Sequence, residues 1–253
     1  MSDNALIEIA VDSVASAIAA ERGSAARVEL CANLLEGGVT PSVGMIAVVR
    51  AATSIGLHVM VRPRGGDFSY EPQEIDVMAR DIAMAKSLGA DGVVLGILTT
   101  SGRVDVNRTR RLVDLARPLE VTFHRAFDMC ADLLGSLEDV CATGADRLLT
   151  SGGEANCLEG METIAALVNA ARGRIAIMAG GGIRPENAAR IIAATGVRDI
   201  HSGLSTAIES PVAYRNPRVA MGKAQGREYE RHQVTEESVR ELRESISGVI
   251  RKA

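Results

Sequence analysis

The sequence predicts one α/β domain with the architecture of a (β/α)8 barrel, also called a TIM barrel. Eight short apolar segments recur along the chain, and helical segments fill the gaps between them. Most of these segments are continuous apolar runs, which is typical of parallel strands buried on both faces. No GxGxxG motif follows the first segment, so the count of eight favours a closed barrel over a doubly wound open sheet.

The expected strands are short, and helices of ordinary length fit between them. The strands lie at 7–11, 27–31, 58–62, 92–96, 120–124, 147–151, 175–179 and 199–203. The intervening segments with the clearest helical composition lie at 13–23, 75–89, 107–118 and 162–173.

Two helix-to-strand junctions are near copies of one another. LGADGVVLG at 88–96 matches TGADRLLTS at 143–151. Gly89 and Gly144 are expected to end their helices in a left-handed conformation, which glycine adopts without a steric penalty. The similarity indicates one strand–helix unit used repeatedly.

The chain changes character after the eighth expected strand. Residues 214–233 are polar, and we expect them to form a loop that covers the barrel. Residues 234–252 predict a closing helix, with Thr235 as N-cap and acidic residues in the first turn. We therefore expect a barrel over about 6–210, a C-terminal loop and helix over 211–253, and a single domain over 1–253.

Composition excludes several classes of protein. The chain has 253 residues, a net charge of −4 and a pI near 5.7, which argues against a nucleic-acid partner. No apolar run is long enough to span a bilayer, and the N-terminus shows no secretory signal. The four cysteines, Cys31, Cys130, Cys141 and Cys157, form no CxxC pair, so we expect free thiols and a cytoplasmic protein. The sequence is compatible with a homo-oligomer.

Polar and glycine-rich features follow the expected strands, at the end of a barrel where functional sites lie. Gly180–Gly182 follow the seventh strand, Ser202 lies in the eighth, and Ser151 ends the sixth. Backbone N–H groups in such turns bind anions, and Pro185 fits the start of the next helix. The alternative is that the glycines only form a tight turn.

The stretch VRPRGGDFSY at 61–70 is a second candidate. Arg62 and Arg64 are expected to bind a carboxylate or phosphate, and Asp67 lies close behind them. Strand alternation places Glu29, Arg62 and His124 in the barrel interior, where charges must be paired. Two interpretations stay open: a structural network in which Arg62 pairs with an interior acid, or a network that also contacts a ligand.

The stretch VTFHRAFDMC at 121–130 concentrates the scarce aromatic and imidazole groups of the chain. Phe123 and Phe127 are expected to anchor the strand and the loop after it. His124 and Arg125 would then lie at the mouth, where His124 could transfer protons together with Glu29 or Asp67. A satisfied interior histidine is the alternative.

The other three histidines carry less signal. His201, beside Ile200 in the last strand, is expected to face the helices. His58 begins a strand near the bottom of the barrel, and His232 lies in the polar tail. We expect structural roles for both.

The sequence alone offers one candidate metal ligand. Cys31 ends the second strand, and a thiol there suits a soft ion. Met60 and Met178 are expected to fill the core.

Six segments together resemble the CutC copper-homeostasis family. They are residues 27–44, 61–70, 121–130, 147–153, 177–187 and 212–217, and the resemblance extends from residue 6 to about 230. It implies a (β/α)8 barrel, a cytoplasmic location, and a role in copper homeostasis and copper-ion binding. No enzymatic reaction follows from it.

The resemblance also implies a copper(I) site made by two cysteines at the ends of the first two strands. The second matches Cys31, but the first falls at Ala10. Copper(I) binding here would need another soft ligand, from methionine, from His124 or from a second subunit.

The sequence therefore supports two hypotheses for the function, from different classes of protein. The first is copper handling through Cys31. The second is an enzyme or sensor for a small phosphorylated or carboxylated metabolite. Its ligand-binding residues would be Arg62, Arg64, Arg125, Ser151, Gly180, Gly181, Gly182 and Ser202, and its catalytic residues His124, Glu29 and Asp67.

Overall fold

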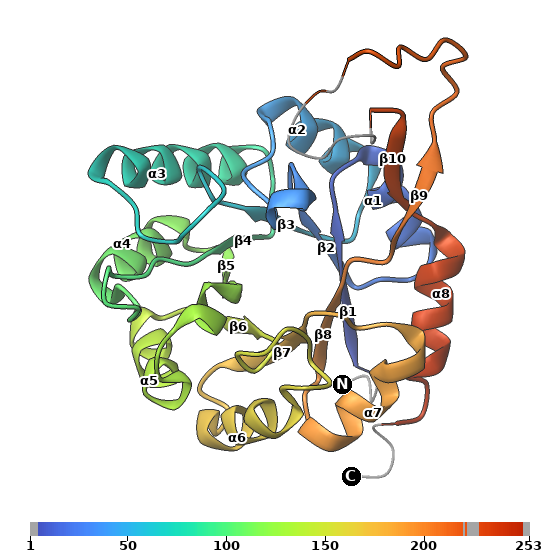
Figure 1. The fold of residues 1–253 in the computed structure, drawn as a ribbon. Coiled ribbons are helices and arrows are strands. Elements are labelled where there is room, and N and C mark those ends of the chain that lie inside the picture. The colour runs from blue at the N-terminus through green and yellow to red at the C-terminus, as the bar shows by residue number, and fades with distance from the viewer. Residues whose placement is uncertain (1–4, 220, 222–227, 250–253) are drawn as a thin grey trace.

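A computed structural model describes residues 5–219, 221 and 228–249. Eight parallel strands form a closed barrel, and helices surround it (Figure 1). The strands are β1 (Leu6–Val11), β2 (Arg27–Leu30), β3 (Gly56–Met60), β4 (Gly92–Leu95), β5 (Glu120–Phe123), β6 (Arg147–Thr150), β7 (Ala176–Gly180) and β8 (Asp199–Ser202). Pairing of β1 with both β2 and β8 closes the barrel, as the sequence predicted.

Helices alternate with the strands, and the last one completes the outer ring. They are α1 (Val14–Arg22), α2 (Val43–Ala52), α3 (Pro72–Ser87), α4 (Val106–Ala116), α5 (Leu133–Thr143), α6 (Met161–Ala171), α7 (Pro185–Thr195) and α8 (Glu236–Ser245). Two short 3₁₀ helices, η1 (Leu34–Glu36) and η2 (Arg125–Met129), follow β2 and β5. In the described part of the chain, no helix combines the length and the apolar character that crossing a membrane requires.

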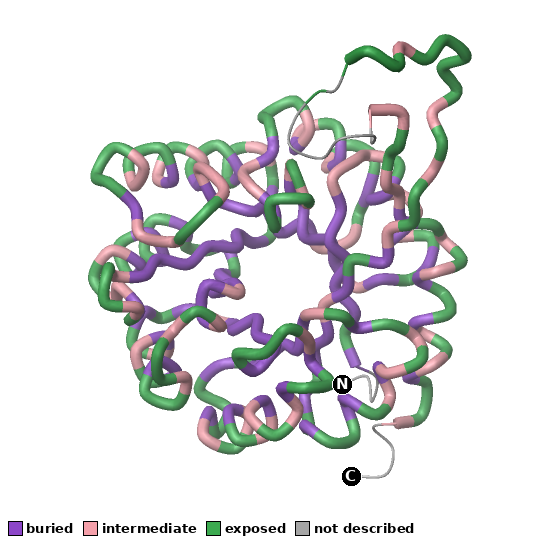
Figure 2. The backbone as a smooth tube through the Cα atoms, in the orientation of Figure 1, coloured by how far each residue is buried: buried purple, intermediate pink, exposed green. Residues whose placement is uncertain are grey.

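The main core lies between the barrel and the helices. Alternate strand residues such as Ile7, Ile9, Leu57 and Phe123 are fully buried there. Figure 2 shows that buried backbone is concentrated in the barrel strands. Burial of each such side chain contributes about 1.5–3 kcal/mol relative to an exposed position.

The amino-terminal end of the barrel interior is filled by buried ion pairs. Arg27 bonds Glu8 at 2.6 Å and Asp199 at 2.9 Å, and Arg147 bonds Asp199 at 2.8 Å. His58 lies beside them, 3.9 Å from Glu8, as expected for a structural residue near the bottom. Removing one partner of such a pair costs about 3–5 kcal/mol, because it leaves a buried charge uncompensated.

Local signals in the sequence are confirmed at three helix ends. Gly89 and Gly144 adopt φ angles of 79° and 82°, the left-handed conformation predicted for both. The side chain of Thr235 accepts a hydrogen bond from the Ser238 amide and caps α8.

The C-terminal region differs from its prediction. The segment expected to be a covering loop instead contains strand β10 (Glu230–Val234), which pairs antiparallel with β9 (Ser205–Glu209). Val234 is buried, and its amide donates to Ser16 of α1, so the hairpin is tied to the outside of the barrel. The polar sequence of β10 lacks the alternation that identifies a strand. Residues 220 and 222–227 of the expected loop, and 250–252 of the expected helix, lie outside the described residues.

Candidate functional site

A cavity of about 240 Å³ opens at the carboxyl ends of the strands, and we call it the rim cavity. Its lining comes from many barrel strands and the loops after them. The polar and glycine residues that line it are Glu29, Gly37, Arg62, His124, Arg125, Gly181, Gly182, His201, Ser202 and Gly203. The sequence predicts a site at the carboxyl ends of the strands, and the rim cavity lies there.

His124 presents one nitrogen that has no partner. Its Nδ1 accepts a hydrogen bond from the Ala126 amide at 3.2 Å, so the ring proton is on Nε2. Nε2 is buried, and no described residue accepts from it. Burial, with the charge of Arg62, lowers the pKa of His124 to about 3. The ring is therefore neutral at pH 7, and its Nε2–H can donate a hydrogen bond to a ligand; the proton-transfer role expected from the sequence stays a prediction.

Arg62 organises the loops of one wall. Its guanidinium donates to the carbonyl oxygens of Glu36, Gly38 and Gly66 at 2.7, 3.0 and 2.7 Å. It also lies 4.8 Å from the centre of the Phe68 ring. The interpretation that Arg62 pairs with an interior acid is wrong, because these carbonyls occupy both of its terminal nitrogens.

Arg125 forms the opposite wall and keeps one nitrogen available. Its Nε bonds Asp128 at 2.7 Å, and Nη2 bonds the Ser151 hydroxyl at 2.7 Å. Among the described residues, Nη1 has no acceptor. Asp128 in turn accepts from the Ser151 amide, so this pair fixes the guanidinium at the cavity. Ser151 thus positions Arg125 and does not itself line the cavity.

The turn after β7 lies against Arg125. Gly181 and Gly182 have φ angles of 130° and 69°, which favour glycine. A Cβ at Gly181 would lie 3.4 Å from the Arg125 guanidinium and 3.1 Å from Ser151. Within the described chain, the amides of Gly181, Gly182 and Gly203 have no acceptor. Backbone N–H groups and a guanidinium together form an environment that suits an anion.

Two other residues of the predicted anion site have structural roles. The Ser202 hydroxyl donates to the carbonyl of Ile183 at 2.7 Å and ties β8 to the turn after β7. Gly180 lies in β7 against Leu149, outside the lining.

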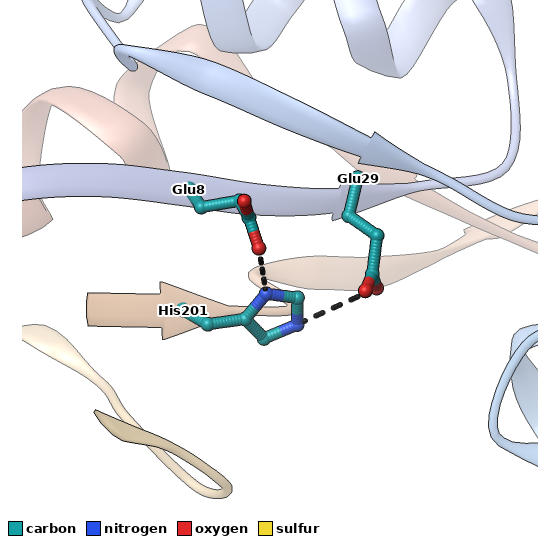
Figure 3. A group of neighbouring side chains, drawn as sticks. All are labelled: Glu8, Glu29 and His201. Atoms are coloured by element: carbon teal, nitrogen blue, oxygen red, sulfur yellow. Dashed lines mark hydrogen bonds and ion pairs between the residues drawn. The ribbon is translucent and has the colours of Figure 1, made fainter. Parts of the chain in front are cut away.

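Glu29 and His201 form the floor of the rim cavity, with Glu8 behind them (Figure 3). His201 Nδ1 lies 2.8 Å from Glu8, and Nε2 lies 3.8 Å from Glu29. The expectation that His201 faces the helices is wrong: Ile200 faces the core, so alternation turns the next residue inward. Burial raises the pKa of Glu29, whereas the pKa of His201 is raised by its two carboxylate neighbours against the effect of burial.

Cys31 lies beside this floor in a small apolar cluster with Met60 and Val94. Its Sγ is 3.5 Å from Glu29. Burial and the charge of Glu29 raise the pKa of Cys31 well above its usual value, so the sulfur is a thiol at neutral pH. Ala10, at the position where the family resemblance implies a second cysteine, lines the cavity with a methyl group. The thiol of Cys31 and the thioether of Met60 are both soft ligands of the kind that copper(I) prefers, but Ala10 supplies no further one.

Arg64 and Asp67 lie away from the rim cavity. Arg64 bonds Glu74 at 2.6 Å and Asp67 at 3.3 Å, and it also donates to the Ser69 carbonyl. Asp67 is exposed. These contacts hold the loop before α3 together, so the position of neither residue favours a role at the cavity.

A second cavity of about 500 Å³ lies between the β9–β10 hairpin and the loops after β1 and β2. Asp12, Asn33 and Leu35 are among its lining residues. None of its lining atoms is among the buried polar atoms without a partner in the described residues. We therefore take the rim cavity as the candidate site.

Comparison with known proteins identifies the family. The CutC family model matches residues 5–206. A family protein CutC of Chromobacterium violaceum is 48% identical over 241 residues, which cover 95% of this chain and 98% of the relative. The human copper homeostasis protein cutC homolog is 48% identical over 217 residues, covering 86% and 80% of the two chains. A crystal structure of CutC from Streptococcus agalactiae matches with a TM-score of 0.74 and 36% identity, over 78% of this chain and 97% of that one. The chain belongs to the CutC family.

Proposed function

We propose that the protein binds a small organic anion, carboxylated or phosphorylated, in the rim cavity. The observation that carries this proposal is the set of hydrogen-bond donors without acceptors around one cavity. Among the described residues they are His124 Nε2, Arg62 Nε, Arg125 Nη1 and the amides of Gly181, Gly182 and Gly203. His124 Nε2 and Arg62 Nε are buried, and a buried donor that lacks an acceptor costs free energy. An anion could accept from these buried donors and from the more exposed Arg125 and glycine amides at once.

The geometry suggests how such a ligand would lie. Its anionic group fits between Arg125 and the glycine turn, where a guanidinium and backbone N–H groups converge. Its other end would reach the floor, within range of His124 and Glu29. Burial raises the pKa of Glu29, so in the absence of a cation its carboxyl group could donate a proton to the ligand. This arrangement supports an enzyme, or a sensor that uses the same contacts.

A thermal-shift screen tests the proposal. Purified protein, reduced and in the presence of a chelator, is melted with phosphate, sulfate and a panel of phosphorylated and carboxylated metabolites. A ligand that binds only the folded chain raises the melting temperature, and at 100 times its dissociation constant it adds about 2.7 kcal/mol. We expect a shift that disappears in Arg125→Ala.

Arg174→Ala is the matched control. The Arg174 side chain is 43% exposed and bonds Glu138, whereas that of Arg125 is 42% exposed and bonds Asp128. Arg174 does not line the rim cavity. A shift that survives in Arg125→Ala, or that is lost equally in Arg174→Ala, would contradict the proposal.

Copper handling is the second candidate function. The names of the mouse and human relatives include copper homeostasis, and the observation in its favour is the contact cluster of Cys31 and Met60. A thermal-shift measurement with copper(I) under reducing conditions, without the chelator, tests it. A stoichiometric shift that is lost in Cys31→Ala would support copper, and no shift would contradict it. The four free cysteines support a reducing, cytoplasmic location for either function.

A further inference from the structure

Glu29 differs from the other buried carboxylates of the barrel interior. Glu8 and Asp199 both bond Arg27, and Asp199 also bonds Arg147. No arginine or lysine among the described residues forms an ion pair with Glu29, and its charged neighbour is the His201 ring. A buried charge without a partner is unfavourable, so Glu29 requires a proton or a cation.

The His201 ring is aimed so that one nitrogen faces Glu29. Glu8 holds Nδ1 at 2.8 Å, which directs Nε2 toward the Glu29 carboxylate (Figure 3). The gap of 3.8 Å between Nε2 and Oε2 is too long for a hydrogen bond. A metal ion bonds to imidazole nitrogen and to carboxylate oxygen at about 2.0–2.2 Å each, so one ion between the two atoms would satisfy both.

Glu29 also has an oxygen with no partner. Its Oε1 is buried and has no hydrogen bond within the described residues, and the residue is 4% exposed. The residue lines the rim cavity. The three side chains can bring one ligand atom each to within 4.8 Å of one another.

We propose that Glu29 and His201 bind a divalent first-row cation, of which Mn²⁺ is the probe, at the floor of the rim cavity. Glu8 positions the ring: metal-binding histidines usually donate their second N–H to a carboxylate, which fixes the ring orientation. One imidazole and one carboxylate form a mixed N and O donor set: the carboxylate suits Mn²⁺, and the imidazole suits other first-row ions such as those of iron and zinc. This site uses no thiol, so it is separate from a copper site at Cys31.

The purpose of the cation rests on the proposed function, although its binding does not. Two protein ligands leave coordination positions open toward the cavity. An oxygen of the anion would complete the coordination, while Arg125 and the glycine turn hold the rest of that ligand. The cation would then polarise a carbonyl or phosphoryl oxygen beside it.

Electron paramagnetic resonance of Mn²⁺ tests the site in the intact protein without any anionic ligand. Titration of free Mn²⁺ should show one bound ion per chain, and the bound ion should couple to one imidazole nitrogen. Glu29→Gln and His201→Gln should each abolish binding. Glu8→Gln should weaken it on the order of 10- to 100-fold, the usual effect of losing a carboxylate behind a metal-binding histidine.

Two control variants complete the design. His232→Gln removes a histidine of β10, and Cys141→Ala removes a thiol of α5 that does not line the rim cavity. Both variants should bind Mn²⁺ as the unaltered protein does. The nitrogen coupling needs no variant, so it shows that a histidine binds the ion even where a substitution prevents folding. No binding by the unaltered protein, no nitrogen coupling, or binding that persists in both Glu29→Gln and His201→Gln would overturn the site. Because the anion screen contains a chelator, either proposal can fail without the other.

Discussion

At the scale of single residues, burial shifts the pKa values of the titratable groups in the rim cavity, in opposite directions for the histidine and the carboxyl group that follow. His124 has its pKa lowered to about 3, so it remains neutral, whereas the pKa of Glu29 is raised. The histidine that the sequence marks as a proton carrier is therefore neutral, and its Nε2–H has no acceptor among the described residues. Burial disfavours the charged form of Glu29 unless a cation neutralises it.

The pKa of His124 predicts a specific loss of stability in acid. Its folded pKa of about 3 is below the ordinary 6.5, so the unfolded chain binds more protons between these two pH values. The stabilisation is complete above pH 6.5 and is lost as the pH falls toward 3. Between pH 7 and pH 5 the free energy of unfolding should fall by about 2 kcal/mol on account of this residue.

Urea unfolding of the unaltered protein and of His124→Gln at the two pH values measures this contribution. Other groups titrate in both proteins and cancel in the comparison. The fall should be smaller in His124→Gln by about 2 kcal/mol. Equal falls in the two proteins would show that His124 is protonated in the folded state.

At the scale of elements, the site is assembled from the segments that follow strands. η2 after β5 carries Arg125, the turn after β7 carries the glycines, and β8 carries His201. α8 closes the ring of helices and holds the chain after the hairpin in place. Its residues Val239 and Leu242 are buried.

The cap of α8 should contribute measurably to stability. Thr235 accepts from the Ser238 amide at 3.2 Å, and an N-cap threonine replaced by alanine usually costs about 1 kcal/mol. Thr235→Ala should therefore lower the free energy of unfolding by about that amount. Thr100→Ala, at an exposed turn position, is the control and should change it by less than about 0.5 kcal/mol. A Thr235→Ala protein as stable as the control would mean that α8 forms independently of its cap.

At the scale of the whole molecule, the sequence predicts the barrel well and the site in part. Buried parallel strands are continuous apolar runs, so all eight were found close to their true bounds. The polar β10 gives no such signal. The position of His124 at a strand end and of Arg125 directly after it predicts both at the mouth, and strand alternation predicts Glu29 in the barrel interior. Arg64 does not line the rim cavity, because it pairs with Glu74 in the next helix. No local sequence pattern predicts such a partner.

The missed residue of the site could have been found. His201 alternates with the apolar Ile200, and that alternation alone turns the histidine toward the barrel interior. The contact between His201 and Glu8 could not have been predicted from the sequence. It depends on pairing between the first and last strands, which become neighbours only when the barrel closes.

The most direct test of the central claim is a crystal structure of the protein with the anion that gives the largest thermal shift. The anionic group should lie between Arg125 Nη1 and the amides of Gly181 and Gly182, with the rest of the ligand toward His124 and Glu29. An anion bound instead in the cavity beside the β9–β10 hairpin, with the rim cavity unchanged, would contradict the account.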